Sequence, residues 1–141
     1  MTGPLIAALE QAVEGSRELD EQIHDLLCAS KFRTCIKGLS DEDGGLWMYE
    51  FPGHAASSAL RVTTSLDAAL ALAERVLPGW YVGVQANRYE LLIAPEDWSA
   101  YLSTPKGHDF KGEVEGSAMT PALALCAAIL RATNPKGQPN V

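Results

Sequence analysis

The sequence lacks any long apolar run, and none approaches the roughly 20 residues that a helix needs to cross a bilayer. Its N-terminus also lacks the basic start and the cleavable apolar segment of a secretory signal. These two absences argue against a membrane-spanning or exported protein, so we expect a cytoplasmic one. At 141 residues and 47% hydrophobic, the chain has the size of one ordinary domain with its own core.

Cysteine and basic residues are also scarce. Three cysteines cannot all pair, and each lies within or beside an apolar stretch, so we expect reduced, buried thiols: Cys28, Cys35 and Cys126. The 11 Lys and Arg residues are outnumbered by 18 Asp and Glu residues, which gives a formal net charge of −7. Broad binding to nucleic acid needs a basic surface and is therefore disfavoured, although a local basic pocket is compatible with this charge.

Recognisable catalytic motifs are missing as well. The sequence contains no G-x-S-x-G elbow, no P-loop and no dinucleotide-binding glycine pattern. Its three histidines, His24, His54 and His108, lie in unrelated segments. Glu113 and Glu115 alternate on one strand face and could act as acid and base, but such pairs are common on exposed strands. We therefore expect a protein without catalytic residues or a cofactor.

The residues allow a zinc site to be considered. His24 and Cys28 are four residues apart on a helix, and Cys35 and His54 could complete the set. Zinc sites of this composition normally have tighter paired spacings such as C-x2-C, and Cys28 lies close to an apolar stripe. We expect no bound metal.

The segment from Val62 to Tyr81 carries the clearest structural signal. Thr64 can cap a helix with Asp67 three residues later, and Pro78 with Gly79 can end it. Apolar residues at helical spacing predict its buried stripe: Leu66, Ala69, Leu70, Ala73, Val76 and Leu77.

Three further helices are predicted. Thr2 and Pro4 can begin the first, whose inner side would carry Leu5, Leu9, Ala12 and Val13. The second follows Ser16, with Leu19, Ile23, Leu26 and Leu27 as its buried stripe. Thr120 caps the last helix and Pro121 begins it; residues 123–130 are apolar almost all round, which indicates cover on more than one side.

Alternating apolar and polar residues predict strands between these helices. Residues 31–37 and 46–51 read as one hairpin with a long polar loop, and residues 80–85 and 88–94 as a second one that turns at Ala86 and Asn87. Residues 96–102 read as a short helical turn, and residues 110–115 as a last strand.

These elements predict an α/β (α+β) protein, a single-domain α-β-α sandwich over residues 1–134. Its sheet would be mainly antiparallel, with four to five strands and helices on both faces. Residues 135–141 would form a disordered tail. The predicted core includes Leu70, Leu77, Trp80, Val82, Leu91, Ile93, Leu125 and Ile129.

A ligand site is predicted where basic and aromatic residues share strands. Lys31, Arg33 and Lys37 alternate on one strand, and Arg61 adds a further guanidinium. Aromatic residues lie on the partner strand and at the next one: Trp47, Tyr49, Phe51 and Trp80. A nucleotide-like ligand would be held by Arg33, Lys37, Arg61, Trp47 and Trp80. The alternative is that the basic residues protect an edge strand and the aromatic rings are core.

Four segments occur in an order that resembles one family: SRELDEQI at 16–23, TTSLDAALAL at 63–72, LPGW at 77–80 and AMTPALALCAAILRA at 118–132. They resemble the small phage ABA sandwich proteins of phages and prophages. The resemblance implies an α-β-α sandwich and a phage origin. The family is largely uncharacterised and brings no catalytic residues with it.

The resemblance, the small size and the missing motifs together suggest a non-enzymatic phage-type binding protein in the host bacterial cytoplasm. It would counter host antiviral defence, either by sequestering a small anionic nucleotide signal or by docking on a defence protein such as a CRISPR effector. An enzyme acting on a small anionic substrate is the alternative of another class. A homodimer would double a shallow basic patch into an enclosed site.

Overall fold

The structure is a computed structural model that describes residues 2–28, 30–34, 46–51, 56–57, 59–87, 97–104 and 114–133. Four helices and five strands form within these ranges. In chain order they are α1 (Thr2–Gln11), α2 (Arg17–Leu27), β1 (Ser30–Thr34), β2 (Leu46–Glu50), α3 (Leu66–Val76), β3 (Tyr81–Asn87), β4 (Asp97–Ser103), β5 (Val114–Ala118) and α4 (Pro121–Thr133).

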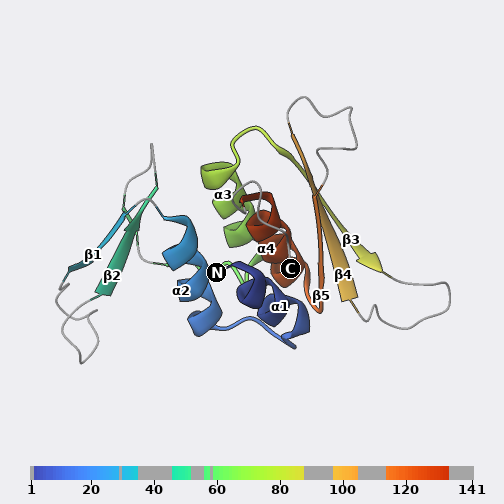
Figure 1. Cartoon of the computed structure of the whole chain (residues 1–141), viewed down its shortest axis with the longest axis horizontal. Coiled ribbons are helices and arrows are strands. Elements are labelled where there is room, and N and C mark those ends of the chain that lie inside the picture. Colours follow the sequence, from blue (N-terminus) through green and yellow to red (C-terminus); the bar gives the residue numbers. More distant parts are fainter. Residues whose placement is uncertain are drawn as a thin grey trace.

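The helices lie between two antiparallel sheets (Figure 1). β1 pairs with β2 beside α2, whereas β3, β4 and β5 form a three-stranded sheet on the other side of the helices. The predicted mixed class with antiparallel strands is confirmed. One sheet of four to five strands with helices on both faces is not found in the described residues, because the hairpin packs its buried rings against α2 and does not extend the other sheet.

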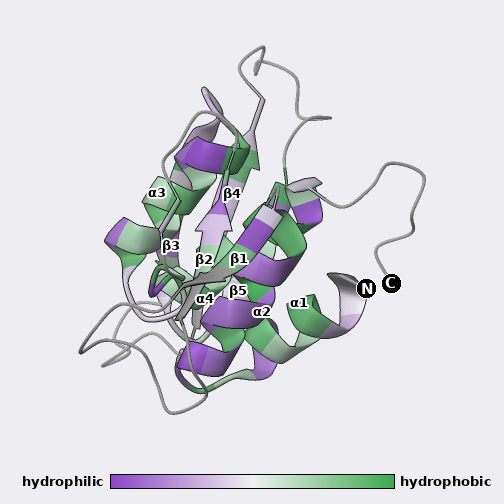
Figure 2. Ribbon diagram, turned by 90° about the vertical axis from the view of Figure 1, so that its left-hand side faces the viewer, coloured by the Kyte–Doolittle hydropathy of each residue, from purple (hydrophilic) through white to green (hydrophobic). Residues whose placement is uncertain are grey.

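The N-terminal helices begin where the sequence predicts, but their buried faces differ. Ser16 caps α2, and its Oγ accepts a hydrogen bond from the Leu19 N–H at 3.1 Å. Figure 2 shows α2 with alternating hydrophilic and hydrophobic bands. Leu26 and Val13 were expected in the core and are exposed, while the polar Asp20 and His24 are buried. The buried face of α2 therefore consists of Asp20, Ile23 and His24.

The cap of α3 is Ser65, one residue after the predicted Thr64. The Ser65 Oγ accepts from the Ala68 N–H at 3.2 Å, because Thr64 belongs to a turn whose N–H groups bond to the Arg61 carbonyl. Leu70 is 38% exposed, so its assignment to the core was wrong; Leu72 is fully buried in its place.

The predicted end of α3 is confirmed. The helix stops at Val76, with Leu77 as its C-cap. Gly79 follows with a φ of 84°, a left-handed backbone conformation that residues with a side chain rarely adopt. The chain can therefore reverse sharply into β3.

α4 forms the centre of the core, as its nearly all-round apolar sequence predicts. Every residue from 122 to 130 is buried, with α1 and α3 packed on it and β4 and β5 alongside. The Leu123 N–H donates to Oγ1 of Thr120 at 3.2 Å, which confirms the predicted cap. Gly116 on β5 lets the sheet approach closely, since a Cβ there would lie 2.4 Å from the Ala124 carbonyl oxygen.

The three-stranded sheet corrects the second predicted hairpin. β3 continues through Ala86 and Asn87, where a turn was predicted, and its partner is β4. The helical turn predicted at 96–102 was therefore wrong. Trp98, Ala100 and Leu102 alternate toward the core, but the small size of Ala100 and the aromatic Tyr101 on the other face weaken this signal in the sequence. β5 includes Val114 and Glu115 of the strand predicted at 110–115 and continues to Ala118, whereas residues 110–113 lie outside the described residues.

The predicted core is confirmed at Leu77, Leu125 and Ile129, which are buried. Trp80 and Val82 are half-buried and pack against it. Leu91, Ile93 and the predicted tail at 135–141 lie outside the described residues. Among the described helices, none has the length and apolarity needed to cross a membrane.

Candidate functional site

A buried polar cluster ties α2 to the segment that precedes α3. Oδ1 of Asp20 accepts hydrogen bonds from the Thr63 backbone N–H at 2.8 Å and from the Thr63 hydroxyl at 2.6 Å. Thr63 Oγ1 also accepts from the Ser16 N–H at 3.0 Å. The Asp20, Thr63 and His24 side chains are almost completely excluded from solvent. Because these side chains are buried and bonded to one another, they hold α2 against the segment before α3, and they have no exposed surface that a ligand could contact.

His24 is held as a neutral imidazole within this cluster. Its Nε2 accepts from the Leu60 N–H at 3.1 Å, so the proton is on Nδ1, which donates to the Asp20 carbonyl oxygen at 2.9 Å. Burial is the main cause of its lowered pKa. Both ring nitrogens are thus occupied, and neither can bind a metal.

Of the other proposed zinc ligands, Cys28 alone lies in the described part of the chain. Burial raises the pKa of the Cys28 thiol, and Cys35 and His54 lie outside the described residues. No group of three or more His, Cys, Asp or Glu residues that could hold a metal ion occurs in the described part of the chain.

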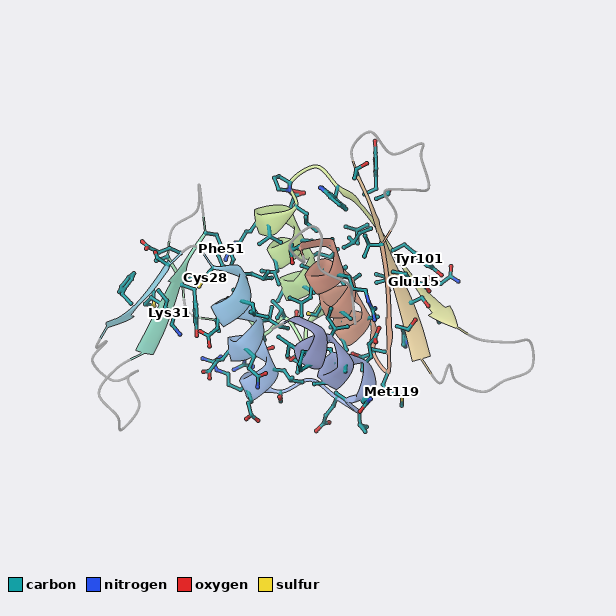
Figure 3. All side chains as sticks on the ribbon, viewed as in Figure 1. Cys28, Lys31, Phe51, Tyr101, Glu115 and Met119 are labelled. Carbon is teal, nitrogen blue, oxygen red and sulfur yellow. The ribbon has the colours of Figure 1, made fainter. Side chains whose placement is uncertain are left out.

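The hairpin's aromatic residues pack on the same histidine. The His24 ring centroid lies 5.2 Å from that of Tyr49 and 5.9 Å from that of Phe51. Both aromatic rings are buried, and burial raises the pKa of Tyr49 to about 12. These contacts favour the alternative that the hairpin aromatics are core. Figure 3 shows Phe51 between the hairpin and α2.

The most ligand-like feature is a hollow of about 350 Å³ on the other side of Phe51. We call it the Arg75 hollow; its lining residues are Leu26, Leu27, Phe51, Arg75, Val76 and Thr133. The ends of α2, α3 and α4 meet there beside the residue that follows β2. The Arg75 Cζ lies 5.7 Å from the Phe51 ring centroid, within range of a cation–π contact.

Arg75 brings a half-buried cation to this hollow. Its Nη1 is buried and has no hydrogen-bond partner within the described structure. A buried donor without an acceptor costs roughly 1–3 kcal/mol, and more when it is charged. An anion in the hollow would balance the guanidinium charge, and a turn of the side chain toward the hollow would give Nη1 its acceptor. The sequence analysis missed Arg75, because a basic residue in the last turn of a helix is ordinary.

The predicted ligand residues are only partly brought together. β1 and β2 pair in a register that sets Arg33 directly opposite Trp47 and Lys31 opposite Tyr49. The register thus pairs a basic with an aromatic position twice along the hairpin. Of these residues, Lys31 reaches α2, where its Nζ lies 2.6 Å from Oδ1 of Asp25.

The remaining predicted residues lie elsewhere. Arg61 is exposed in the turn before α3, and Trp80 is half-buried before β3, on the far side of the helices from the hairpin (Figure 1). Lys37 lies outside the described residues. Of the described members, Arg33 and Trp47 alone are shown as direct neighbours.

A second hollow, of about 300 Å³, lies between α1 and α2. Its lining residues are Pro4, Leu5, Ala8, Gln22, Asp25 and Leu26. The only charged group among them is the Asp25 carboxylate, which repels anions and already forms an ion pair with Lys31. The Arg75 hollow is the better candidate for an anion.

The two described cysteines offer no activated nucleophile. Cys126 is completely buried in α4, and its thiol donates to the Val62 carbonyl oxygen at 3.2 Å. Burial raises the pKa of this thiol, as it does for Cys28, so both stay protonated at neutral pH. Glu115, half of the predicted carboxylate pair, lies on β5 (Figure 3), and Glu113 lies outside the described residues.

Comparisons of the chain with protein-family models, with curated proteins and with solved structures found no match. The resemblance to phage ABA sandwich proteins therefore stays a prediction from the sequence.

Proposed function

We propose that this chain is a non-enzymatic binding protein that holds a small anion in the Arg75 hollow. The observation that carries this proposal is Arg75, which lines a largely apolar hollow and whose buried Nη1 has no acceptor among the described residues. Charge-assisted hydrogen bonds from a guanidinium to an anion are about twice as strong as neutral ones.

Comparison with Arg131 supports a ligand role for Arg75. Arg131 on α4 reaches both carboxylate oxygens of Glu10 on α1, at 2.5 and 2.9 Å, and it also donates to the Glu115 carbonyl oxygen. This side chain shows how the fold satisfies an arginine that has a structural role. Arg75 has a ring contact with Phe51 in place of such a carboxylate.

The proposal keeps part of the sequence-based hypothesis and changes the site. A small anionic ligand and a non-catalytic role are retained, whereas Arg75 and Phe51 replace Arg33, Lys37, Arg61, Trp47 and Trp80 as the binding residues. Interference with host antiviral defence is a further proposal that rests on the resemblance. The nucleotide as the sequestered signal was predicted from the basic and aromatic residues that Arg75 and Phe51 replace, so it is not carried over to this site. Direct docking on a defence protein has no specific structural observation in its favour.

Calorimetric titration of the full chain with a panel of small carboxylates, phosphates and nucleotides tests the proposal. We expect Arg75→Gln to weaken binding of the preferred anion at least tenfold. Arg17→Gln is the matched control, because Arg17 is half-exposed on α2 in an ion pair with Glu21, and it should leave affinity unchanged. No binding by any anion, or binding that is equal in wild type and Arg75→Gln, would refute the proposed function.

A stability measurement separates a ligand role from a structural one. If Arg75 serves a ligand, Arg75→Met should raise the free energy of unfolding of the ligand-free protein by about 1–3 kcal/mol, because it removes the buried Nη1 donor that has no acceptor. A clear loss of stability in urea would show that Arg75 mainly supports the fold.

A further inference from the structure

We propose that the ligand of the Arg75 hollow is a monocarboxylate with an apolar body, and not a nucleotide. This inference rests on the proposed function and specifies its ligand. Three properties of the hollow carry it: the single cation, the apolar walls and the small volume.

The first property is charge. Arg75 is the only charged residue among the described lining residues, so it can balance one negative charge. Charges of both signs surround the lining. Asp25 and Glu21 act electrostatically on nearby Tyr49. Lys31 acts on Cys28 and Arg17 on the neutral ring of His24, but neither cation lines the hollow. In a chain with a net charge of −7, a ligand with two or more phosphate charges would keep an unbalanced negative charge.

The second property is the shortage of further donors. The Thr133 hydroxyl, the other polar side-chain group in the lining, donates to the carbonyl oxygens of Ile129 and Leu130 at 3.0 and 3.2 Å. The guanidinium is thus the one side-chain donor that the described lining presents. A carboxylate has two oxygens in the geometry of a guanidinium fork, whereas a phosphate dianion has three terminal oxygens that seek donors.

The third property is the wall. Leu26, Leu27 and Val76 line the hollow with the Phe51 ring, so the ligand body should be aliphatic or aromatic. A volume of about 350 Å³ is near the lower end of the range for small-molecule sites, which is roughly 300–1,000 Å³. A nucleotide would place a polar sugar and base against these apolar walls.

Calorimetry with matched ligands tests the ligand class. The series acetate, butanoate and hexanoate varies the apolar body at constant charge, and we expect about fourfold tighter binding per added methylene. Hexan-1-ol removes the charge and should bind at least tenfold more weakly than hexanoate. AMP and inorganic phosphate should bind more weakly than hexanoate, and Arg75→Gln should abolish the preference for hexanoate over hexan-1-ol.

The outcomes separate this inference from the proposed function. If AMP or phosphate binds more tightly than hexanoate and the binding depends on Arg75, the ligand class is wrong and the proposed function stands. If affinity does not increase from acetate to hexanoate, the apolar walls take no part and the ligand class is again wrong. If none of these anions binds in an Arg75-dependent way, both proposals fail.

Discussion

The backbone N–H of Leu60 donates to Nε2 of His24 across 3.1 Å, so a side chain of α2 fixes the segment that leads to α3. The same imidazole contacts the Tyr49 and Phe51 rings. The Arg75 guanidinium in turn lies over the Phe51 ring. One histidine therefore connects α2, the hairpin and the wall of the Arg75 hollow. This arrangement requires a neutral ring, because a protonated Nε2 would face the Leu60 N–H donor with a second donor.

The His24 hydrogen bonds predict a pH-dependent stability. The folded-state pKa of His24 is lowered below 6.5 by burial, with Arg75 and Arg17 acting in the same direction and Asp20 against it. The unfolded state then binds more protons between these two pKa values. His24 should therefore leave stability unchanged above pH 6.5 and decrease it as the pH falls from 6.5 to the folded pKa, by at most about 1.4 kcal/mol per pH unit.

Urea titrations of wild type and His24→Gln at pH 7.5 and 5.5 measure this effect. The variant should be less stable than wild type at pH 7.5 and should lose less stability on acidification. Equal losses in the two proteins would show that His24 does not titrate in this window.

The buried hydrogen bond between the Thr63 hydroxyl and Asp20 should contribute to the stability of the fold. Thr63→Val keeps the side-chain shape but removes the hydroxyl donor from the buried carboxylate, and we expect a loss of about 1–3 kcal/mol of unfolding free energy. The neighbouring Thr64→Val is the control, because Thr64 is exposed and its change should stay within about 0.5 kcal/mol. Urea unfolding that shows similar effects for both variants would contradict this role.

Two leucines of α3 provide a test of which face the helix buries. Leu72→Ala should lower the unfolding free energy by about 2–5 kcal/mol, because Leu72 is fully buried and truncation leaves a cavity. Leu70→Ala should cost no more than about 1 kcal/mol, since Leu70 already contacts solvent. Chemical denaturation that ranks the two variants in the opposite order would mean that α3 is rotated about its axis.

Two glycines of the three-stranded sheet differ in the space available for a side chain. At Gly116 an added Cβ would meet the backbone of α4, with the Ala124 oxygen at 2.4 Å and the Ala128 nitrogen at 2.6 Å. At Gly83 no atom lies within 4 Å of the added Cβ. We therefore expect Gly116→Ala to destabilise the protein by about 1–3 kcal/mol or more and Gly83→Ala to be nearly neutral. Melting temperatures measured by calorimetry would reveal equal effects if the sheet can shift away from α4.

Local signals account for what could be predicted. The capping residues Ser16 and Thr120 and the stop at Gly79 act through hydrogen bonds and backbone angles of their own segments, so the helix bounds follow from nearby residues. β4 could not be recognised in this way. Its alternation depends on small residues such as Ala100, whose burial comes from the helices packed on it.

The candidate site depended still less on local pattern. The hairpin pairing of Arg33 with Trp47 agrees with the sequence, because alternation and register are properties of two neighbouring strands. Arg75, by contrast, gains its character from Phe51 and from the ends of three helices that are distant in sequence. The spacing of residues within α3 does not indicate that Nη1 of Arg75 lacks a hydrogen-bond partner.

The sequence by itself determined where each helix begins to within a residue or two, the first hairpin and the burial of residues 122–130 in α4, because propensity, capping and hydrophobic period act over a few residues. Only the tertiary structure decided which face of α3 is buried. Apolar residues surround most of that helix, so Leu70 and Leu72 fit the pattern equally well, and packing against α4 selects between them. The same holds for Asp20, His24, Thr63 and Arg75, since burial and hydrogen-bond partners are properties of segments that folding brings together.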